Sequence, residues 1–120
     1  MKKLKLPKMR VPLFECGDIY FCKTKEEWEK AFQFLNLQSE IPPEIVGRAT
    51  SFKSNAGHRV YLIGVFDQSI STLAHESAHI AFDICRDVGV NVLPENANET
   101  FCYLLTRLVE FGELHIRKPA

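Results

Sequence analysis

Residues 75–79 read His-Glu-Ser-Ala-His and restrict the local fold of this chain more than any other segment. Two histidines four positions apart share a face only in a helix, where they differ by about 40° around the axis and by one turn along it. Apolar residues at helical spacing, with small residues beside them, predict such a helix from about 70 to 87. Ser69 or Ser71 can cap its start. The H-E-x-x-H pattern therefore lies on an amphipathic helix.

The two histidines of this pattern predict a zinc site. Imidazole nitrogen is a good zinc ligand, and a catalytic zinc site uses three protein ligands and leaves a fourth position open. Glu76 lies about 100° from His75 around the helix, so it can reach a water at the site without being a ligand. Zinc lowers the pKa of such a water. We therefore predict His75 and His79 as metal ligands and Glu76 as the general base.

A second helix is predicted to follow the first and to run beside it. Apolar residues at helical spacing extend from 95 to 111, Pro94 suits the first position, and Gly112 suits the stop. Residues 89–93 give the chain room to reverse. The second helix can therefore pack antiparallel to the helix that carries the histidines.

The third metal ligand is expected on this second helix, where two glutamates are candidates. Glu95 and Glu99 are one turn apart, so one can bind the metal while the other hydrogen-bonds a ligand histidine. Glu99 lies one turn deeper and beside apolar residues, which favours it because a ligand needs packed neighbours. His58, next to a turn, and His115, in the tail, are less attractive alternatives.

The rest of the chain predicts a small sheet. We expect short strands at 11–15, 19–22, 48–54 and 58–66. The last of these is apolar on both faces, so it should be central or covered on both sides. Thr24 with Glu27 three positions later forms a capping box that opens a helix to about residue 35. Residues 36–47 contain two adjacent prolines and are expected to form a loop.

These elements predict one α+β domain over residues 1–120. The expected fold is a small and mainly antiparallel sheet covered by about three helices, with H-E-x-x-H on the second helix. Residues 1–9 are basic, contain a proline and are expected to be a flexible lead.

Composition excludes several classes of function. Fifteen basic residues balance fifteen acidic ones, so there is no net-charge signal for nucleic acid or an anionic membrane. The longest apolar runs are far shorter than the roughly 20 residues of a membrane-spanning helix. Early prolines interrupt any signal peptide, and the four cysteines form no C-x-x-C pair. We therefore expect a cytoplasmic protein with reduced cysteines.

The run from 58 to 105 resembles small gluzincin-type metallopeptidase domains found in bacteriophages and prophages. The resemblance is carried by the strand HRVYLIGVF, the helix STLAHESAHIAFDI, Gly89 and the segment NETFCYLL. In that family, H-E-x-x-H is followed by a glycine and then by E-x-x-x-Y-L, which Glu99, Tyr103 and Leu104 match. The resemblance implies a minimal zincin-like domain in which Glu99 is the third zinc ligand and Glu76 the base. It also implies a phage-encoded protein acting in the bacterial host cytosol.

A looser likeness is to ImmA/IrrE-like metallopeptidases, which cut repressors. In them the ligand glutamate precedes an Asp or Asn by four positions. That register would give the metal to Glu95 and make Glu99 a supporting acid. Glutamate at position 99 departs from the pattern, so this register is the less favoured one.

The function predicted from these features is zinc-dependent hydrolysis of peptide bonds, with a peptide or protein as substrate. The substrate groove is expected between the motif helix and the strand 58–66. Tyr61, Tyr103 and His115 are candidates for stabilising the transition state. One alternative is a non-hydrolytic zinc-binding protein that binds and modulates a host protein. Another is a module that blocks a host protein without turnover.

Overall fold

The computed structural model describes residues 4–53 and 56–118 and shows an α+β fold. In chain order, the elements are β1 (Lys8–Arg10), β2 (Gly17–Cys22), α1 (Lys25–Phe34), β3 (Gly47–Lys53), β4 (Arg59–Val65), α2 (Ile70–Asp87) and α3 (Asn98–Ile116). The H-E-x-x-H segment lies on α2, the second helix, as predicted.

The strands form one four-stranded sheet in the order β1-β2-β4-β3. β1 and β3 run antiparallel to their neighbours, whereas β2 and β4 pair in parallel. The sheet is therefore mixed, with two of its three pairings antiparallel. β4 lies between β2 and β3, which confirms the inner position that its two apolar faces predicted.

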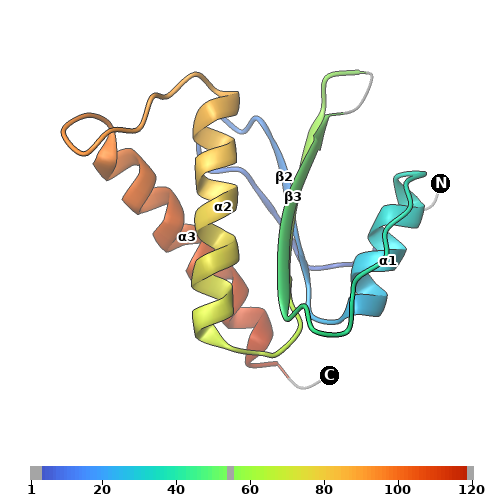
Figure 1. Cartoon of the computed structure of the whole chain (residues 1–120). Helices are drawn as coiled ribbons and strands as arrows, with labels where there is room; N and C mark the ends of the chain where they lie inside the picture. The colour runs from blue at the N-terminus through green and yellow to red at the C-terminus, as the bar shows by residue number, and fades with distance from the viewer. Residues whose placement is uncertain (1–3, 54–55, 119–120) are drawn as a thin grey trace.

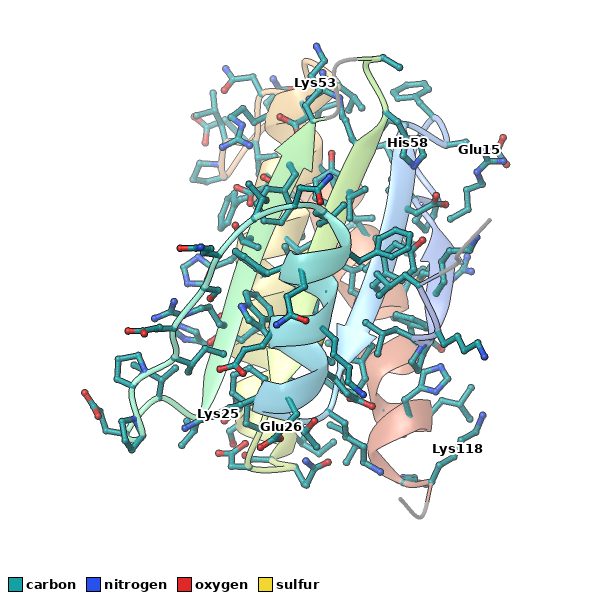
Figure 2. The ribbon with its side chains drawn as sticks, turned by 90° about the vertical axis from the view of Figure 1, so that its right-hand side faces the viewer. Glu15, Lys25, Glu26, Lys53, His58 and Lys118 are labelled. Carbon is teal, nitrogen blue, oxygen red and sulfur yellow. The ribbon has the colours of Figure 1, made fainter. Side chains whose placement is uncertain are left out.

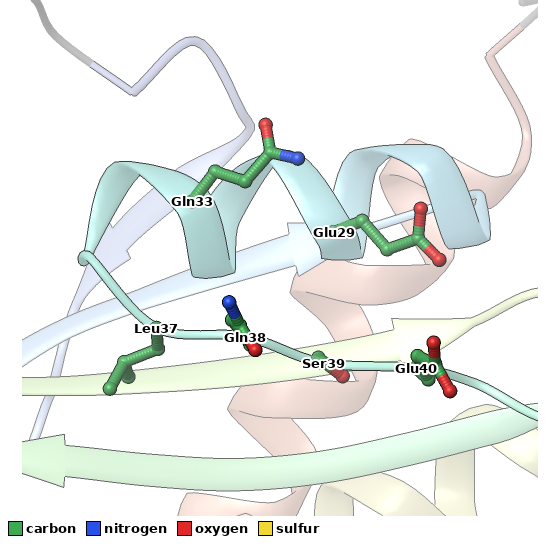
Figure 3. A pocket seen from close by; sticks show the side chains of 6 residues that line it. All are labelled: Glu29, Gln33, Leu37, Gln38, Ser39 and Glu40. Atoms are coloured by element: carbon green, nitrogen blue, oxygen red, sulfur yellow. The ribbon is translucent and has the colours of Figure 1, made fainter.

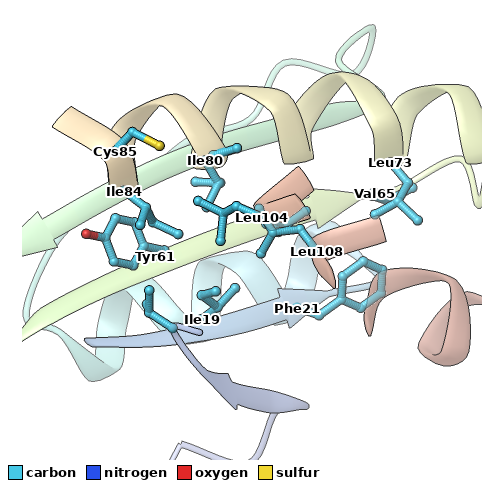
Figure 4. Packing of buried hydrophobic residues seen from close by; sticks show 13 residues of the cluster. Ile19, Phe21, Tyr61, Val65, Leu73, Ile80, Ile84, Cys85, Leu104 and Leu108 are labelled. Atoms are coloured by element: carbon cyan, nitrogen blue, oxygen red, sulfur yellow. The ribbon is translucent and has the colours of Figure 1, made fainter. Parts of the chain in front are cut away.

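Helices cover both faces of this sheet, as Figure 1 shows. Alternate side chains of β4 point to opposite faces, which is the period of a strand. Tyr61, Ile63 and Val65 belong to the core under α2 and α3 (Figure 4). Val60 and Leu62 belong to a second core that includes Trp28 of α1. After Arg59 the strand is apolar, which agrees with the burial of both of its faces.

Helix α1 begins with the predicted capping box. The amide nitrogen of Glu27 donates to Thr24 Oγ1 at 3.1 Å, and the carboxylate of Glu27 accepts from the amide of Lys23 at 2.6 Å. Trp28 and Ala31 of the helix are buried against the sheet. The cap fixes where the helix starts, and its apolar face fixes how the helix packs.

Helix α2 also begins at a predicted cap. Ser69 Oγ accepts from the amides of Ser71 at 3.1 Å and Thr72 at 3.4 Å. Leu73, Ile80 and Ile84 are fully buried on the face toward the sheet. This seating leaves the opposite face of α2, including both histidines, exposed to solvent.

The bounds predicted for the last helix are wrong at both ends. α3 starts at Asn98 because Leu93 and Asn96 exchange two backbone hydrogen bonds in a tight turn, at 2.8 and 3.0 Å. Ala97 then adopts a left-handed conformation with φ of 60°. Gly112 does not stop the helix, which continues to Ile116. A Cβ at position 112 would overlap the side chain of Leu73, so this glycine permits close packing of α3 on α2.

The N-terminal strand also differs from its prediction. The strand is β1 rather than 11–15, so residues 8 and 9 belong to the sheet, while residues 1–3 of the expected flexible lead lie outside the described part. Phe14 and Glu15 have positive φ values of 58° and 46°, which suits a turn and not a strand. The amide of Val11 closes this turn on the carbonyl of Gly17 at 2.9 Å. A short edge strand of charged residues carries no alternating apolar pattern that would reveal it.

All four cysteines are free, in agreement with the predicted reduced state. Cys22 and Cys85 are buried, and burial followed by the charge of Glu27 raises the pKa of Cys22 to about 12. No helix in residues 4–53 and 56–118 is long and apolar enough to cross a membrane.

Candidate metal centre

The two motif histidines point toward one another from successive turns of α2. His75 Nε2 and His79 Nε2 are 3.3 Å apart, and the ring planes meet at 76°. Two imidazole nitrogens bound tetrahedrally to one zinc at 2.0–2.1 Å are about 3.3 Å from each other. The exposed pair therefore has the spacing that a shared zinc ion requires.

Glu76 completes the cluster from the inner side of the helix. Ligand atoms of His75, Glu76 and His79 all lie within 4.8 Å of one another, and the described residues contain no other such group of histidine, cysteine and acidic side chains. Glu76 is only 8% exposed, in contrast to the two histidines. A buried carboxylate thus lies directly beside an exposed histidine pair.

Two opposing effects act on the Glu76 carboxyl. Burial is the larger one and raises its pKa above the usual glutamate range, because the charged form loses hydration. His75, His79 and Arg48 act in the other direction through their positive charge. The raised pKa makes this carboxylate a better proton acceptor than an exposed glutamate would be.

Gly47, the first residue of β3, brings the sheet close to this carboxylate. A Cβ added at position 47 would lie 3.0 Å from Glu76 Oε2 and would overlap Thr72 Cγ2. The absence of a side chain therefore lets the backbone of β3 contact α2 at the motif. Position 47 showed no distinguishing signal in the sequence, because the need for glycine comes from a helix that follows much later.

The Gly47→Ala variant tests this close approach. We expect it to lower the free energy of unfolding by about 1–3 kcal/mol, as overpacking of a filled site commonly does. In the same background, Thr72→Ser removes the overlapped methyl group but keeps the hydroxyl that donates to Asp67. The double variant should recover part of the loss in a denaturant titration. A fully additive double-mutant cycle would contradict the proposed contact.

The structure does not place either candidate third ligand in the cluster. Glu99 is exposed in the first turn of α3 and is not a member of the group formed by the motif residues. Its position is tied to the C-terminal half of α2, because the rings of Phe101 and Phe82 pack with centroids 4.4 Å apart. Glu95 lies in the turn before α3, so the two acids are not one turn apart on one helix, contrary to prediction.

The weaker histidine candidates also lie elsewhere. His58 Nε2 is 3.0 Å from Asp18 Oδ2, at the start of β4. The ring of His115 stacks on Phe21 at a centroid distance of 6.1 Å, and burial lowers its pKa. Neither histidine belongs to the cluster on α2.

Both tyrosine candidates have other surroundings in the structure. Tyr61 is fully buried, its hydroxyl donates to Asp87 Oδ2 at 2.7 Å, and burial together with this bond raises its pKa. Tyr103 is 68% exposed and lines a hollow against Leu13 on the far side of α3. No described contact brings either hydroxyl to the histidine pair.

A pocket beside the cluster was not predicted from the sequence. It has a volume of about 440 Å³ and is lined by Glu44, Ile45, Val46, Gly47, Ser71, Thr72, His75 and Glu76. The expected loop at 36–47 supplies one wall, and the first turns of α2 supply the other. The pocket forms only when this loop folds against α2, so no local sequence pattern predicts it.

A different hollow lies on the α1 side of the sheet, between α1 and the segment 37–40 (Figure 3). Its lining includes two carboxylates, Glu29 and Glu40, but no histidine or cysteine. It therefore lacks the imidazole and thiolate ligands on which most zinc sites rely, and α2 contributes nothing to its walls.

No protein-family model, curated protein or solved structure matches this chain. The case for a metal centre therefore rests on the geometry of His75, Glu76 and His79.

Proposed function

We propose that this protein is a zinc-dependent metallopeptidase. The observation that carries the proposal is the 3.3 Å spacing of His75 Nε2 and His79 Nε2, on an exposed helix face beside the buried carboxylate of Glu76. Neutral imidazole nitrogens suit zinc, and a site with few protein ligands keeps a position open for water or substrate. Structural zinc sites, in contrast, are closed and rich in cysteine.

In this proposal, His75 and His79 hold the metal and Glu76 moves the proton. Zinc in the site would supply Lewis acidity, which activates water and polarises a carbonyl group. A carboxylate oxygen of Glu76 accepts the proton of the attacking water and passes it to the nitrogen of the leaving amine. Its raised pKa supports the first transfer, because a more basic carboxylate accepts a proton more readily.

The free edge of β3 is the proposed binding site for the substrate backbone. The amide of Phe66 donates to the carbonyl of Val46 at 2.8 Å, so these two residues form a hydrogen-bonded pair just before Gly47 pairs with Val65. Because bonded and non-bonded pairs alternate, Gly47, Ala49 and Ser51 direct their backbone groups away from β4. An extended peptide can pair with such an edge. This changes the predicted groove, since β4 itself is paired on both sides.

The position of this edge supports a peptide substrate. Gly47 begins β3, and a Cβ there would lie 3.0 Å from Glu76 Oε2, so this end of the edge is close to the proposed base. A peptide paired with β3 would therefore pass the proposed base and the histidine pair. Lys53 ends the strand and is exposed (Figure 2).

The experiment that tests this function is cleavage of a peptide library by the zinc-loaded protein. We expect new peptide termini with the loaded protein, their loss after chelation, and their return on adding zinc. Mass spectrometry of the products gives the readout. Bound zinc without any cleavage would overturn hydrolysis and would favour the non-hydrolytic alternative.

We further propose Glu99 as the third ligand. The structure places it outside the group of His75, Glu76 and His79, so its side chain would have to move toward them to bind the metal. It lies within α3, whose first turn packs on α2 through Phe101 and Phe82, whereas Glu95 lies in the preceding turn. We expect Glu99→Gln to weaken zinc binding more than 100-fold, and Glu95→Gln by about tenfold or less, since loss of a supporting partner costs 10–100-fold. Competition with a chromophoric chelator measures both. A larger loss for Glu95→Gln would favour the alternative register.

A further inference from the structure

The pocket beside the histidine cluster has one wall made of four consecutive residues, Glu44 to Gly47. The opposite wall comes from the first turns of α2 and includes His75 and Glu76. Its volume of about 440 Å³ exceeds what a single side chain needs. Because His75 and Glu76 line the pocket, a substrate residue next to the scissile bond would meet it.

The wall is held in place by the backbone on both sides of Glu44. The amide of Ile45 donates to the carbonyl of Pro42 at 3.1 Å, which closes a turn with Pro43 and Glu44 at its centre. Lys25 Nζ donates to the carbonyls of Pro42 and Pro43 at 3.2 and 3.0 Å. The pocket wall is thus preorganised, which lowers the entropic cost of binding.

Hydrogen bonds also fix the far end of the wall. The carbonyl of Val46 accepts from the amide of Phe66 on the β4 side, at 2.8 Å. Gly47 is paired with Val65 in the sheet and contacts Glu76. The segment from Pro42 to Gly47 is therefore tied to α1 at one end and to the sheet at the other.

The lining combines an apolar wall with a carboxylate. Ile45 and Val46 supply the apolar surface, and Val46 is 50% exposed although it is aliphatic. Glu44 is exposed beside them. Glu76 adds a second carboxyl, and no lysine or arginine lines the pocket. No basic side chain of the pocket balances these two carboxyls, and a zinc ion held by His75 would offset the charge of Glu76 but leave that of Glu44.

The N-terminus of α2 does not make the pocket attractive to anions. A free helix N-terminus attracts anions through its unpaired amides. Here the amides of Ser71 and Thr72 already donate to Ser69 Oγ. The carboxylate of Asp67 accepts from the amide of Ser69 and from the hydroxyl of Thr72, at 3.1 and 2.9 Å. The helix start thus carries its own anion, and the amides of Ser69, Ser71 and Thr72 already have acceptors.

We propose that this pocket selects substrates with a lysine or arginine beside the scissile bond. The aliphatic stem of that side chain would pack on Ile45 and Val46, and its cationic head would pair with Glu44. This inference rests on the proposed peptidase function and adds its substrate class. Glu44 is then the residue that determines specificity.

The test compares matched peptides that differ at one position. Zinc-loaded protein is given peptides with lysine, norleucine, alanine or aspartate next to the cut that the library experiment identifies. Norleucine keeps the stem of lysine but lacks the charge. We expect the order lysine, norleucine, alanine, aspartate in kcat/KM. Glu44→Gln should lower the lysine-to-norleucine ratio about fivefold, the upper range for an exposed ion pair.

Two further variants sharpen the result. Glu44→Lys should invert the preference and favour aspartate over lysine at that position. Glu40→Gln is the matched control, because Glu40 belongs to the same loop but lines the hollow near α1. It should leave the ratio unchanged. Thermal unfolding of each variant checks that the fold is retained.

The outcomes separate this inference from the function on which it rests. Absence of all cleavage by the zinc-loaded protein overturns the proposed function and the inference with it. Cleavage with equal rates for lysine and norleucine, or an unchanged ratio in Glu44→Gln, overturns only the specificity. A ratio that falls equally in Glu40→Gln would also overturn it, because the effect would then not come from the pocket.

Discussion

Replacing His75 and His79 together with alanine is expected to abolish zinc binding. The wild type should carry about one zinc per chain, because its two Nε2 atoms already have the spacing of ligands to one ion. The two imidazoles are exposed, so the metal-free variant should unfold within about 0.5 kcal/mol of the metal-free wild type. Elemental analysis after dialysis gives the zinc content, and denaturant titration gives the stability.

The control for this experiment is His58→Ala. His58 pairs with Asp18 at the start of β4 and lies outside the cluster on α2, so this variant should keep its zinc. Zinc should also raise the unfolding temperature of the wild type and of the control, since a ligand of the folded state stabilises it. Full zinc content in the double variant would contradict the proposed metal site.

Glu76→Gln is expected to lower peptide hydrolysis by about 10²–10⁴-fold while zinc stays bound. Glutamine has nearly the same shape, but its amide cannot accept and return the proton. The buried side chain faces Gly47 in a narrow space, so a substitution of the same size is the appropriate one. Initial rates on the best library peptide measure the loss, and elemental analysis measures the zinc.

A matched control for this variant is Glu110→Gln, which changes an exposed glutamate of α3. It should hydrolyse the peptide at the wild-type rate. Equal rates for the wild type and Glu76→Gln would show that the proposed base is wrong. Loss of zinc together with activity in Glu76→Gln would show instead that Glu76 acts as a ligand.

The elements that local chemistry defines were predicted well from the sequence. The caps at Thr24 and Ser69 start α1 and α2 as expected, because a side-chain oxygen three positions from an amide is enough to form them. The apolar pattern of β4 fixed its inner position, since only a strand buried on both faces needs it. The spacing of His75 and His79 similarly requires no information beyond the helix.

The errors at the two ends of the last helix have different causes. Gly112 is the residue type that often ends a helix, but here it allows α3 to pack closely on Leu73 of α2. Pro94 suits a helix start, but the paired turn of Leu93 and Asn96 delays α3 to Asn98. The first contact is long-range, whereas the second is a local turn that the position of Pro94 did not reveal. The sequence therefore predicted Glu95 and Glu99 one turn apart on one helix, whereas only Glu99 lies in α3.

What the sequence by itself determined is the histidine pair with its adjacent glutamate, because all three belong to one turn and a half of one helix. Only the tertiary structure decided what surrounds them. Packing of α2 on the sheet buries Glu76 and exposes both histidines, and Gly47 lets the free edge of β3 approach the cluster. The loop from Pro42 to Val46 then forms the pocket wall. These features depend on long-range packing, which fixes distances between segments that no local period encodes.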